Sequence, residues 1–221
     1  MRRWMALSII TLVVTSAAFA QDARLRRLAT GEDARAWEAV GRLNIAGTGF
    51  CTGTLIAPKM VLTAGHCLFD KKTGARIDHG EIEFLAGWRS GRASAYRSVR
   101  RAVVHPDYTY GARVNSDGVR NALALLELEH PIRDGKIKPF STAARPRRGT
   151  QVGVVSYGKG RSEAPSLQEL CSVLAQQEGV LVTSCSVDFG SSGAPIFIVR
   201  DGTPQIVSVV SAKAEIEGEA V

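Results

Sequence analysis

Short runs of apolar and β-branched residues recur along the chain, and glycine or proline residues separate them. Runs of this length with turn residues between them are typical of antiparallel strands in a sandwich or barrel. Helical patterning is weak except at Glu32–Glu38 and just after His66. The pattern predicts an all-β fold with strands at Ala39–Ile45, Thr52–Ala57, Met60–Thr63, Ile82–Ala86, Ala95–Val104, Leu123–Leu128, Val152–Tyr157, Leu167–Ala175, Val180–Thr183, Ile196–Val199 and Gln205–Ser211.

A polar link that carries proline and arginine, Pro139–Gly149, divides these strands into two similar halves. We therefore expect two antiparallel β-barrels side by side, an N-terminal one at about 34–138 and a C-terminal one at about 150–221. Few residues follow the last predicted strand, so the second barrel has little sequence left for a final strand. Either Ala214–Glu217 supplies its last strand, or that strand is missing and the sheet has an exposed edge.

The first twenty residues, Met1–Ala20, have the pattern of a secretory signal peptide. Arg2 and Arg3 precede a short apolar core, and Ala18-Phe19-Ala20 matches a cleavage site. A retained membrane anchor is the alternative, but the core is short for a bilayer span. We expect a mature chain of residues 21–221 that is exported to the periplasm or the medium and does not contact the membrane after the signal is removed.

The charge of the chain does not point to a nucleic-acid partner. The formal net charge is +7, and it falls to +5 without the signal segment. A charge of this size favours solubility, and we expect a monomer. The basic residues gather in two clusters, which we interpret as solvated faces or loops: Arg97, Arg100 and Arg101, and then Arg145, Arg147 and Arg148.

Four cysteines are present, and an even number in an exported chain favours disulfides. Each has a partner across a short hairpin-like segment, so we expect Cys51–Cys67 and Cys171–Cys185. A zinc site that uses His66 and Cys67 is the competing interpretation, but the spacing of metal-binding motifs is absent. The sequence therefore predicts two disulfides and no metal site.

Two stretches carry candidate chemistry. Gly190-Ser-Ser192-Gly lies between apolar runs, and glycine turns of this kind can expose a serine hydroxyl and point successive N–H groups at one place. By itself, such a turn is more often an ordinary loop. His66 follows a predicted strand and precedes Cys67, which would also suit a surface histidine beside a structural disulfide.

Together, these stretches resemble the motifs of trypsin- and chymotrypsin-like serine proteases. Thr63-Ala-Gly-His66-Cys67 is similar to TAxHC, and Gly190-Ser-Ser192-Gly-Ala-Pro195 is similar to GxSGxP in the bacterial glutamyl-endopeptidase-like branch. The similarity covers most of residues 25–211, with further features in matching order at Cys51, Val104–Tyr108, Ala124–Leu126 and Ser156–Gly158.

The resemblance implies two barrels of the chymotrypsin type with an active site in the cleft between them. It also implies that Ser192 attacks a peptide carbonyl of a polypeptide substrate and that His66 is the general base. The N–H groups of Gly190 and Ser192 would bind the oxyanion. No metal or organic cofactor is implied.

The chain departs from the family at the triad aspartate. The motif position is Ala122, and alanine can neither orient a histidine nor stabilise its charged form. Asp117 is the nearest upstream carboxylate, but its separation argues against substitution, and the Asn121 side chain should point to the opposite face of the strand. We therefore expect an exported serine endopeptidase weakened at Ala122, with a catalytically inactive polypeptide-binding homologue as the alternative.

Two further departures concern activation and specificity. Ser191 stands where trypsin-like zymogens carry an aspartate that pairs with a newly freed N-terminus, which argues against that trigger. Ser186 stands where trypsin carries its pocket aspartate, so a preference for Arg or Lys loses its support. We expect a polar-to-neutral substrate pocket lined by Ser186, Phe189 and Ser211, with Lys213 favouring an acidic side chain.

Overall fold

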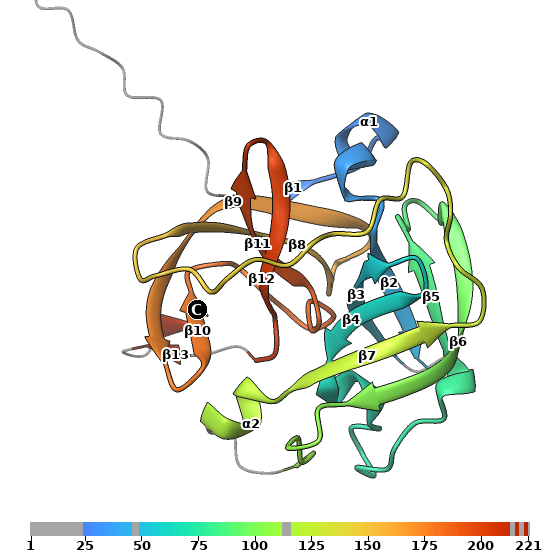
Figure 1. Ribbon diagram of the computed structural model, residues 1–221, viewed down its shortest axis with the longest axis horizontal. Helices are drawn as coiled ribbons and strands as arrows, with labels where there is room; N and C mark the ends of the chain where they lie inside the picture. Colours follow the sequence, from blue (N-terminus) through green and yellow to red (C-terminus); the bar gives the residue numbers. More distant parts are fainter. Residues whose placement is uncertain (1–23, 46–48, 112–115, 213–214, 217–218, 221) are drawn as a thin grey trace, which may run out of the picture.

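The protein is described by a computed structural model that covers residues 24–45, 49–111, 116–212, 215–216 and 219–220. The expected signal peptide, residues 1–20, and the expected pocket residue Lys213 lie outside the described residues. Two β-rich halves lie side by side, and the N-terminal half is the blue-to-green part of the ribbon (Figure 1).

The N-terminal half is a closed barrel of six antiparallel strands in the order β2-β3-β4-β7-β6-β5. Successive side chains of a strand point to opposite faces, so one set can fill the barrel interior while the other faces outward. In β7, Ala124 and Leu126 are buried while Leu125 is exposed. Leu43, Leu55 and Leu126 are fully buried in its interior. The strands are β2 (Val40–Ile45), β3 (Gly49–Ala57), β4 (Met60–Ala64), β5 (Ile82–Ala86), β6 (Ala95–Val104) and β7 (Leu123–Leu128).

The C-terminal half is one antiparallel sheet in the order β1-β9-β8-β11-β12, and β10 also pairs with β9. Its strands are β1 (Arg26–Arg27), β8 (Gln151–Gly158), β9 (Arg161–Gln177), β10 (Val180–Thr183), β11 (Pro195–Arg200) and β12 (Thr203–Val209). The expected mostly β architecture is confirmed, and in the part of the chain described the second half is a sheet beside one closed barrel. At the C-terminal end, β13 (Glu215–Ile216) pairs with β14 (Glu219–Ala220), so the described part of the expected strand 214–217 does not extend the large sheet.

The helices are short, as the weak helical patterning predicts. They are α1 (Gly31–Ala34), η1 (Arg35–Trp37), η2 (Gly65–Leu68), η3 (His79–Glu81) and α2 (Ser116–Arg120), where η marks a 3₁₀ helix. Thr30 caps α1 through a hydrogen bond from the Asp33 N–H to its hydroxyl. Among the described helices, none has the length and apolar character needed to span a membrane.

An aromatic cluster joins the two halves. The Trp37 ring lies 4.6 Å from the Phe197 ring of β11 and 5.7 Å from the ring of Phe140 in the link between the halves, centroid to centroid. Leu28 and Tyr157 are fully buried in the same cluster. Burial of these large side chains fixes the two halves against each other, so loops from each half can share one site.

Candidate active site

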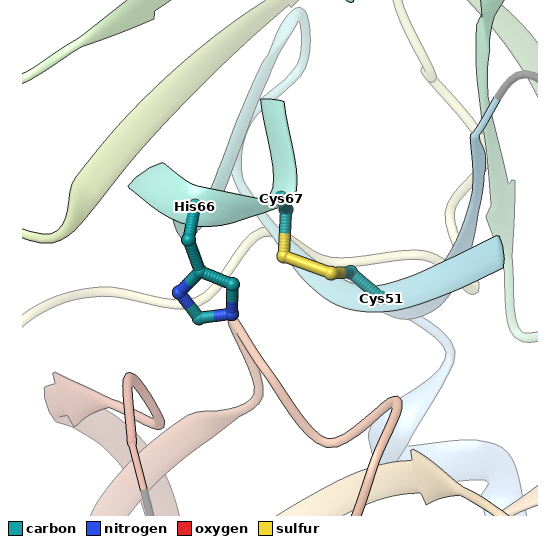
Figure 2. A group of neighbouring side chains, drawn as sticks. All are labelled: Cys51, His66 and Cys67. Carbon is teal, nitrogen blue, oxygen red and sulfur yellow. A yellow bond between two sulfur atoms is a disulfide. The ribbon is translucent and has the colours of Figure 1, made fainter. Parts of the chain in front are cut away.

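His66 lies in η2, directly after β4, and its position is held from two sides. The Cys51–Cys67 disulfide links the next residue to β3, as expected. The N–H of Gly65, the preceding residue, donates a 2.9 Å hydrogen bond to the carbonyl of Ala122. Figure 2 shows the imidazole beside the disulfide, on the side that faces the ribbon of the C-terminal half.

Ser192 lies in the turn between Cys185 and β11, and two glycines give this turn its shape. Gly190 has φ +94° and Gly193 has φ +81°, which are left-handed conformations that glycine adopts at least cost. A Cβ on Gly190 would lie 2.1 Å from the Phe50 ring, and a Cβ on Gly193 would lie 2.1 Å from the Thr63 hydroxyl. Neither position therefore accepts a side chain without displacement of its neighbours.

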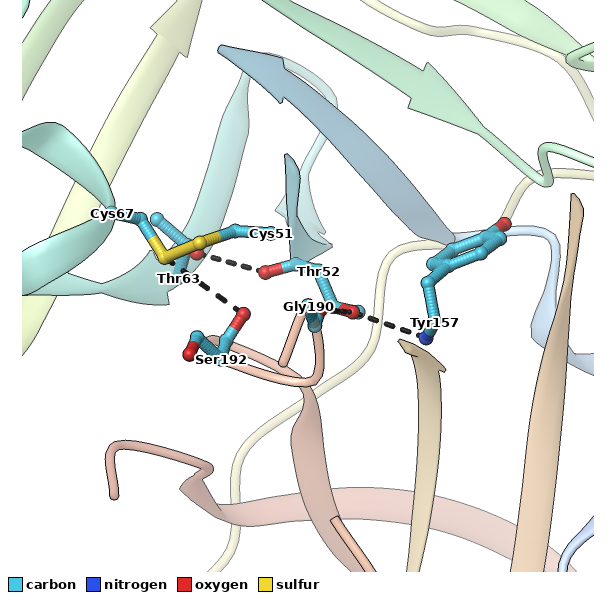
Figure 3. Close-up of a disulfide and its surroundings, with 7 residues drawn as sticks. All are labelled: Cys51, Thr52, Thr63, Cys67, Tyr157, Gly190 and Ser192. Atoms are coloured by element: carbon cyan, nitrogen blue, oxygen red, sulfur yellow. Dashed lines mark hydrogen bonds between the residues drawn. A yellow bond between two sulfur atoms is a disulfide. The ribbon is translucent and has the colours of Figure 1, made fainter. Parts of the chain in front are cut away.

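Thr52 of the N-terminal barrel holds this turn in register with His66. Its hydroxyl donates to the Gly190 carbonyl at 2.8 Å, and its N–H donates to the Ser192 carbonyl at 2.9 Å. The same hydroxyl accepts a 3.1 Å hydrogen bond from the Tyr157 N–H of β8. Figure 3 shows the contacts of the Thr52 hydroxyl beside the disulfide, where the Cys67 sulfur lies 3.9 Å from the Ser192 carbonyl oxygen. One fully buried threonine thus joins the barrel, the sheet and the serine turn.

The peptide groups of the turn are oriented so that two N–H groups are free. The Phe189 carbonyl accepts from the Lys159 N–H at 2.8 Å, and the Ser191 carbonyl accepts from the Ala194 N–H at 2.9 Å. In a planar trans peptide the C=O and N–H point in opposite directions. The N–H groups of Gly190 and Ser192 therefore point away from these bonds, and neither donates to an acceptor among the described residues.

His66 and Ser192 line one cavity of about 540 Å³ between the two halves, although no hydrogen bond joins them within the described chain. Two predicted pocket residues, Phe189 and Ser211, also line it. Ser186 does not: it is exposed beside the Cys171–Cys185 disulfide, and its N–H donates to the Gln168 side chain at 2.7 Å. Ser186 is therefore not among the residues that line this cavity.

Several residues that line this cavity were not expected from the sequence, among them Lys71 and Asp188. Lys71 lines the cavity, and its ammonium lies 5.4 Å from the centroid of the Phe189 ring, across the two halves. The Phe189 side chain is 71% exposed, so this contact lies at the mouth of the cavity. Nothing in the sequence distinguishes Lys71 from Lys72, because only the fold decides which of two adjacent lysines faces His66.

The triad aspartate position holds a small apolar side chain beside His66. Ala122 is 2% exposed and lines the same cavity as the histidine. Asp117 does not replace it, because its carboxylate forms a 2.7 Å ion pair with Arg120 at the surface. Across the described residues, no carboxylate lies within ion-pair distance of His66.

The electrostatics of the site follow from this lack of a carboxylate. Burial and, to a smaller extent, the nearby charge of Lys71 together lower the pKa of His66 from 6.5 to about 4. No carboxylate opposes these two effects, so the imidazole is neutral at pH 7. A neutral imidazole can accept a proton from a serine hydroxyl, but it is a weak base here.

The geometry does not favour a metal site at this position. Potential ligand atoms of Cys51, His66 and Cys67 lie within 4.8 Å of one another. However, both sulfurs are bonded to each other in the disulfide, and metal binding by cysteine requires a thiolate. This leaves one imidazole, which is too few ligands for a protein metal site.

Comparison with known proteins places this arrangement in context. Residues 30–219 match the Trypsin family model. Human serine protease 23 is 28% identical over 67% of this chain and 43% of its own length, and the Bacillus licheniformis glutamyl endopeptidase is 24% identical over 67% of this chain and 45% of its own. The chain thus matches less than half the length of these relatives. A structure of Glu endopeptidase in complex with MPD superposes with a TM-score of 0.72 at 19% identity, covering 89% of this chain and 87% of the other.

Proposed function

Because this chain belongs to the trypsin/chymotrypsin-like serine protease family, we propose that it is an exported serine endopeptidase that cleaves peptide bonds through Ser192. The observation that carries the proposal is the shared cavity: His66 from the N-terminal barrel and Ser192 from the C-terminal half line it together. The matched relatives include a protein named glutamyl endopeptidase, which supports peptide hydrolysis as the reaction class.

In this proposal the Ser192 hydroxyl attacks the carbonyl carbon of the scissile peptide while the His66 imidazole accepts its proton. The carbonyl oxygen becomes an oxyanion, for which the free N–H groups of Gly190 and Ser192 are the donors. His66 then gives the proton to the leaving amine, and an acyl group remains on Ser192. Water attacks this ester with His66 again as base, which releases the second product and restores the serine.

The rate of this reaction is limited by the base. Proton transfer creates an imidazolium, and burial beside Lys71 disfavours that charge. A triad carboxylate would normally stabilise it, and loss of that carboxylate lowers serine protease turnover by about 10⁴-fold. We therefore propose slow hydrolysis with an intact nucleophile turn.

The proposed compartment is oxidising. Both disulfides close short loops, of sequence separation 16 and 14, and such bonds persist in exported proteins. A polypeptide is the proposed substrate, because the cavity lies between the two halves and is open at a mouth bordered by Phe189 and Lys71.

The test is covalent labelling of Ser192 by a fluorophosphonate, followed by peptide mapping, together with hydrolysis of a mixed peptide library. The expected result is slow labelling at Ser192 that disappears in Ser192→Ala and falls strongly in His66→Ala. A matched control is Ser208→Ala, which removes a serine from β12 outside this cavity. No labelling of the folded protein at any probe concentration would reject the proposal.

A second function is favoured by one observation, the lack of a carboxylate within ion-pair distance of His66 in the described chain. A non-catalytic homologue would hold a polypeptide in the same cavity. It would bind peptides with equal affinity before and after Ser192→Ala, and it would show no turnover even in Ala122→Asp. Turnover by the Ala122→Asp variant would decide in favour of the endopeptidase.

A further inference from the structure

Arg161 is a largely buried cation close to the serine turn, in the tight hairpin between β8 and β9. Its guanidinium donates to the Ser156 carbonyl, to the Ser156 hydroxyl at 3.0 Å and to the Ser191 hydroxyl at 2.9 Å. Among the described residues, no carboxylate lies within ion-pair distance of it. A buried charge is costly, and here three hydrogen bonds to neutral oxygens and the more distant carboxylate of Asp188 compensate it. The hydrogen bonds of Arg161 therefore connect β8 to the residue that precedes Ser192.

Ser191 receives this guanidinium in a fully enclosed position, with 0% of its surface exposed. Its hydroxyl also accepts from the Asp188 N–H at 3.2 Å and donates to the Tyr157 carbonyl at 3.0 Å, with the Ser156 hydroxyl 3.3 Å away. A serine hydroxyl has one proton and two acceptor sites, so these contacts use its full capacity. The side chain of Ser191 is consequently fixed from both strand β8 and its own turn.

The same hairpin also fixes the direction of an oxyanion donor. Lys159, two residues before Arg161, donates its N–H to the Phe189 carbonyl at 2.8 Å, which orients the Gly190 N–H in the opposite direction. The hairpin residues 158–161 thus contact the serine turn on both sides of Gly190. A shift of this hairpin would move the peptide group that presents the Gly190 N–H.

The backbone of the hairpin leaves room for the guanidinium. A Cβ at Gly158 would lie 2.8 Å from the Cζ, Nε and Nη2 atoms of Arg161, and Gly158 is itself buried. Gly158 does not have a left-handed φ, so a side chain at this position would displace the guanidinium and would not strain the backbone. The space that the Arg161 guanidinium occupies is therefore formed by Gly158 at the end of β8.

We propose that Arg161 is a positioning residue that holds the oxyanion turn through Ser191, by side-chain hydrogen bonds that do not involve a freed N-terminus. This inference rests on the proposed function, because it assigns the turn to the nucleophile Ser192. Arg161 and Ser191 are separated by thirty positions in the sequence, and the hydrogen bond between their side chains forms when the sheet folds.

The test compares Arg161→Ala, Arg161→Lys and Gly158→Ala with the exposed-site control Arg200→Ala. The first readout is the second-order rate constant for fluorophosphonate labelling of Ser192, and thermal midpoints are recorded in parallel. We expect Arg161→Ala to label about 10- to 100-fold more slowly, because the donor remains but is no longer held in place. Guanidinium chloride at a sub-denaturing concentration should restore part of the rate, while equal sodium chloride should not.

The conservative variants separate positioning from folding. Arg161→Lys keeps the charge and one donor, so it should recover part of the rate, whereas Gly158→Ala should lower the rate with Arg161 still present. Arg200→Ala should match the wild type. Equal labelling of Arg161→Ala and wild type, or a loss that follows the thermal midpoint alone and is not rescued by guanidinium, would overturn the inference.

Hydrogen exchange of residues 185–195 provides a readout that does not need catalysis. Exchange in this segment should be faster in Arg161→Ala and unchanged in Arg200→Ala, and unchanged exchange in Arg161→Ala would reject the positioning role. If the wild type is not labelled but exchange responds to Arg161→Ala, the proposed function fails while the positioning role stands. The two failures are thus distinguishable.

Discussion

The backbone N–H of Gly65 donates a 2.9 Å hydrogen bond to the carbonyl of Ala122. This bond joins the residue before His66 to the residue at the family's aspartate position. A Cβ on Gly65 would lie 3.3 Å from the Ala122 carbonyl carbon, so the two segments are in close contact. Position 122 therefore lies next to the histidine, and the absence of a carboxylate there follows from the residue type and not from a displaced loop.

Restoring the carboxylate should increase activity. Ala122→Asp places an acid in the cavity that His66 lines, where it can orient the imidazole and stabilise the imidazolium. We expect kcat/KM for peptide hydrolysis to rise by about 10²- to 10⁴-fold. Ala122→Asn is the matched control, because it adds similar volume without charge, and it should give only a small part of the gain. An equal response to Asp and Asn would exclude charge as the cause.

The pH dependence of labelling should reflect the low pKa of His66. Because burial lowers this pKa to about 4, the neutral base is already fully populated at pH 6, and the labelling rate should be flat from there to pH 8. Ala122→Asp adds an opposite charge, which favours the imidazolium and should move the acid limb upward by about 1–3 pH units. Fluorophosphonate labelling between pH 4 and 8 measures both profiles.

The same pKa has a consequence for stability. Between pH 6.5 and about 4 the unfolded chain binds a proton at His66 that the folded chain does not. The free energy of unfolding should therefore decrease as the pH falls through this window. Urea titrations of wild type and His66→Gln should show a smaller decrease in the variant, and parallel pH profiles would contradict this assignment.

Removing the charge of Lys71 should raise the pKa of His66. Lys71→Ala eliminates the cation that disfavours the imidazolium, so the acid limb of labelling should shift to higher pH. Lys72→Ala is the matched control, because the adjacent lysine is not part of the cavity wall. NMR titration of the His66 ring should show the same difference, and equal shifts in both variants would indicate a general effect of net charge.

Packing around the serine turn should make Gly193 intolerant of a side chain. Gly193→Ala combines a left-handed backbone with a Cβ 2.1 Å from the Thr63 hydroxyl, so we expect a loss of about 2–5 kcal/mol in the free energy of unfolding. Gly202→Ala has a similar φ of +73° but nothing within 4 Å of the added Cβ. It should cost only about 1–2 kcal/mol. Urea unfolding of both variants measures the difference, which isolates the packing cost.

The two disulfides should differ in their effect on the site. Each closes a loop of similar length, so replacing either pair by alanines should cost about 3 kcal/mol. Loss of Cys51–Cys67 should also slow labelling of Ser192, because that bond anchors the residue next to His66. Loss of Cys171–Cys185 should slow the labelling of Ser192 less than loss of Cys51–Cys67 does. Stability and labelling rate, compared at a temperature where both variants are folded, distinguish the two.

The local pattern of the sequence determined the β architecture and the short motifs. Alternating apolar residues and turn glycines predicted most strands within a few residues, since burial on one face and left-handed turns are local requirements. It also identified His66, Ser192 and Ala122 through spacing that resembles a known family. These features can be predicted from one sequence because each depends on residues that are close together along the chain.

Tertiary structure decided which distant residues share the site. It placed Lys71 in the cavity, left Ser186 at the surface and connected Arg161 to Ser191. The sequence does not encode these choices locally, because each depends on which side chains meet after the barrel and the sheet pack together. Contacts across many residues of chain depend on burial and geometry in three dimensions, and only the folded protein specifies them.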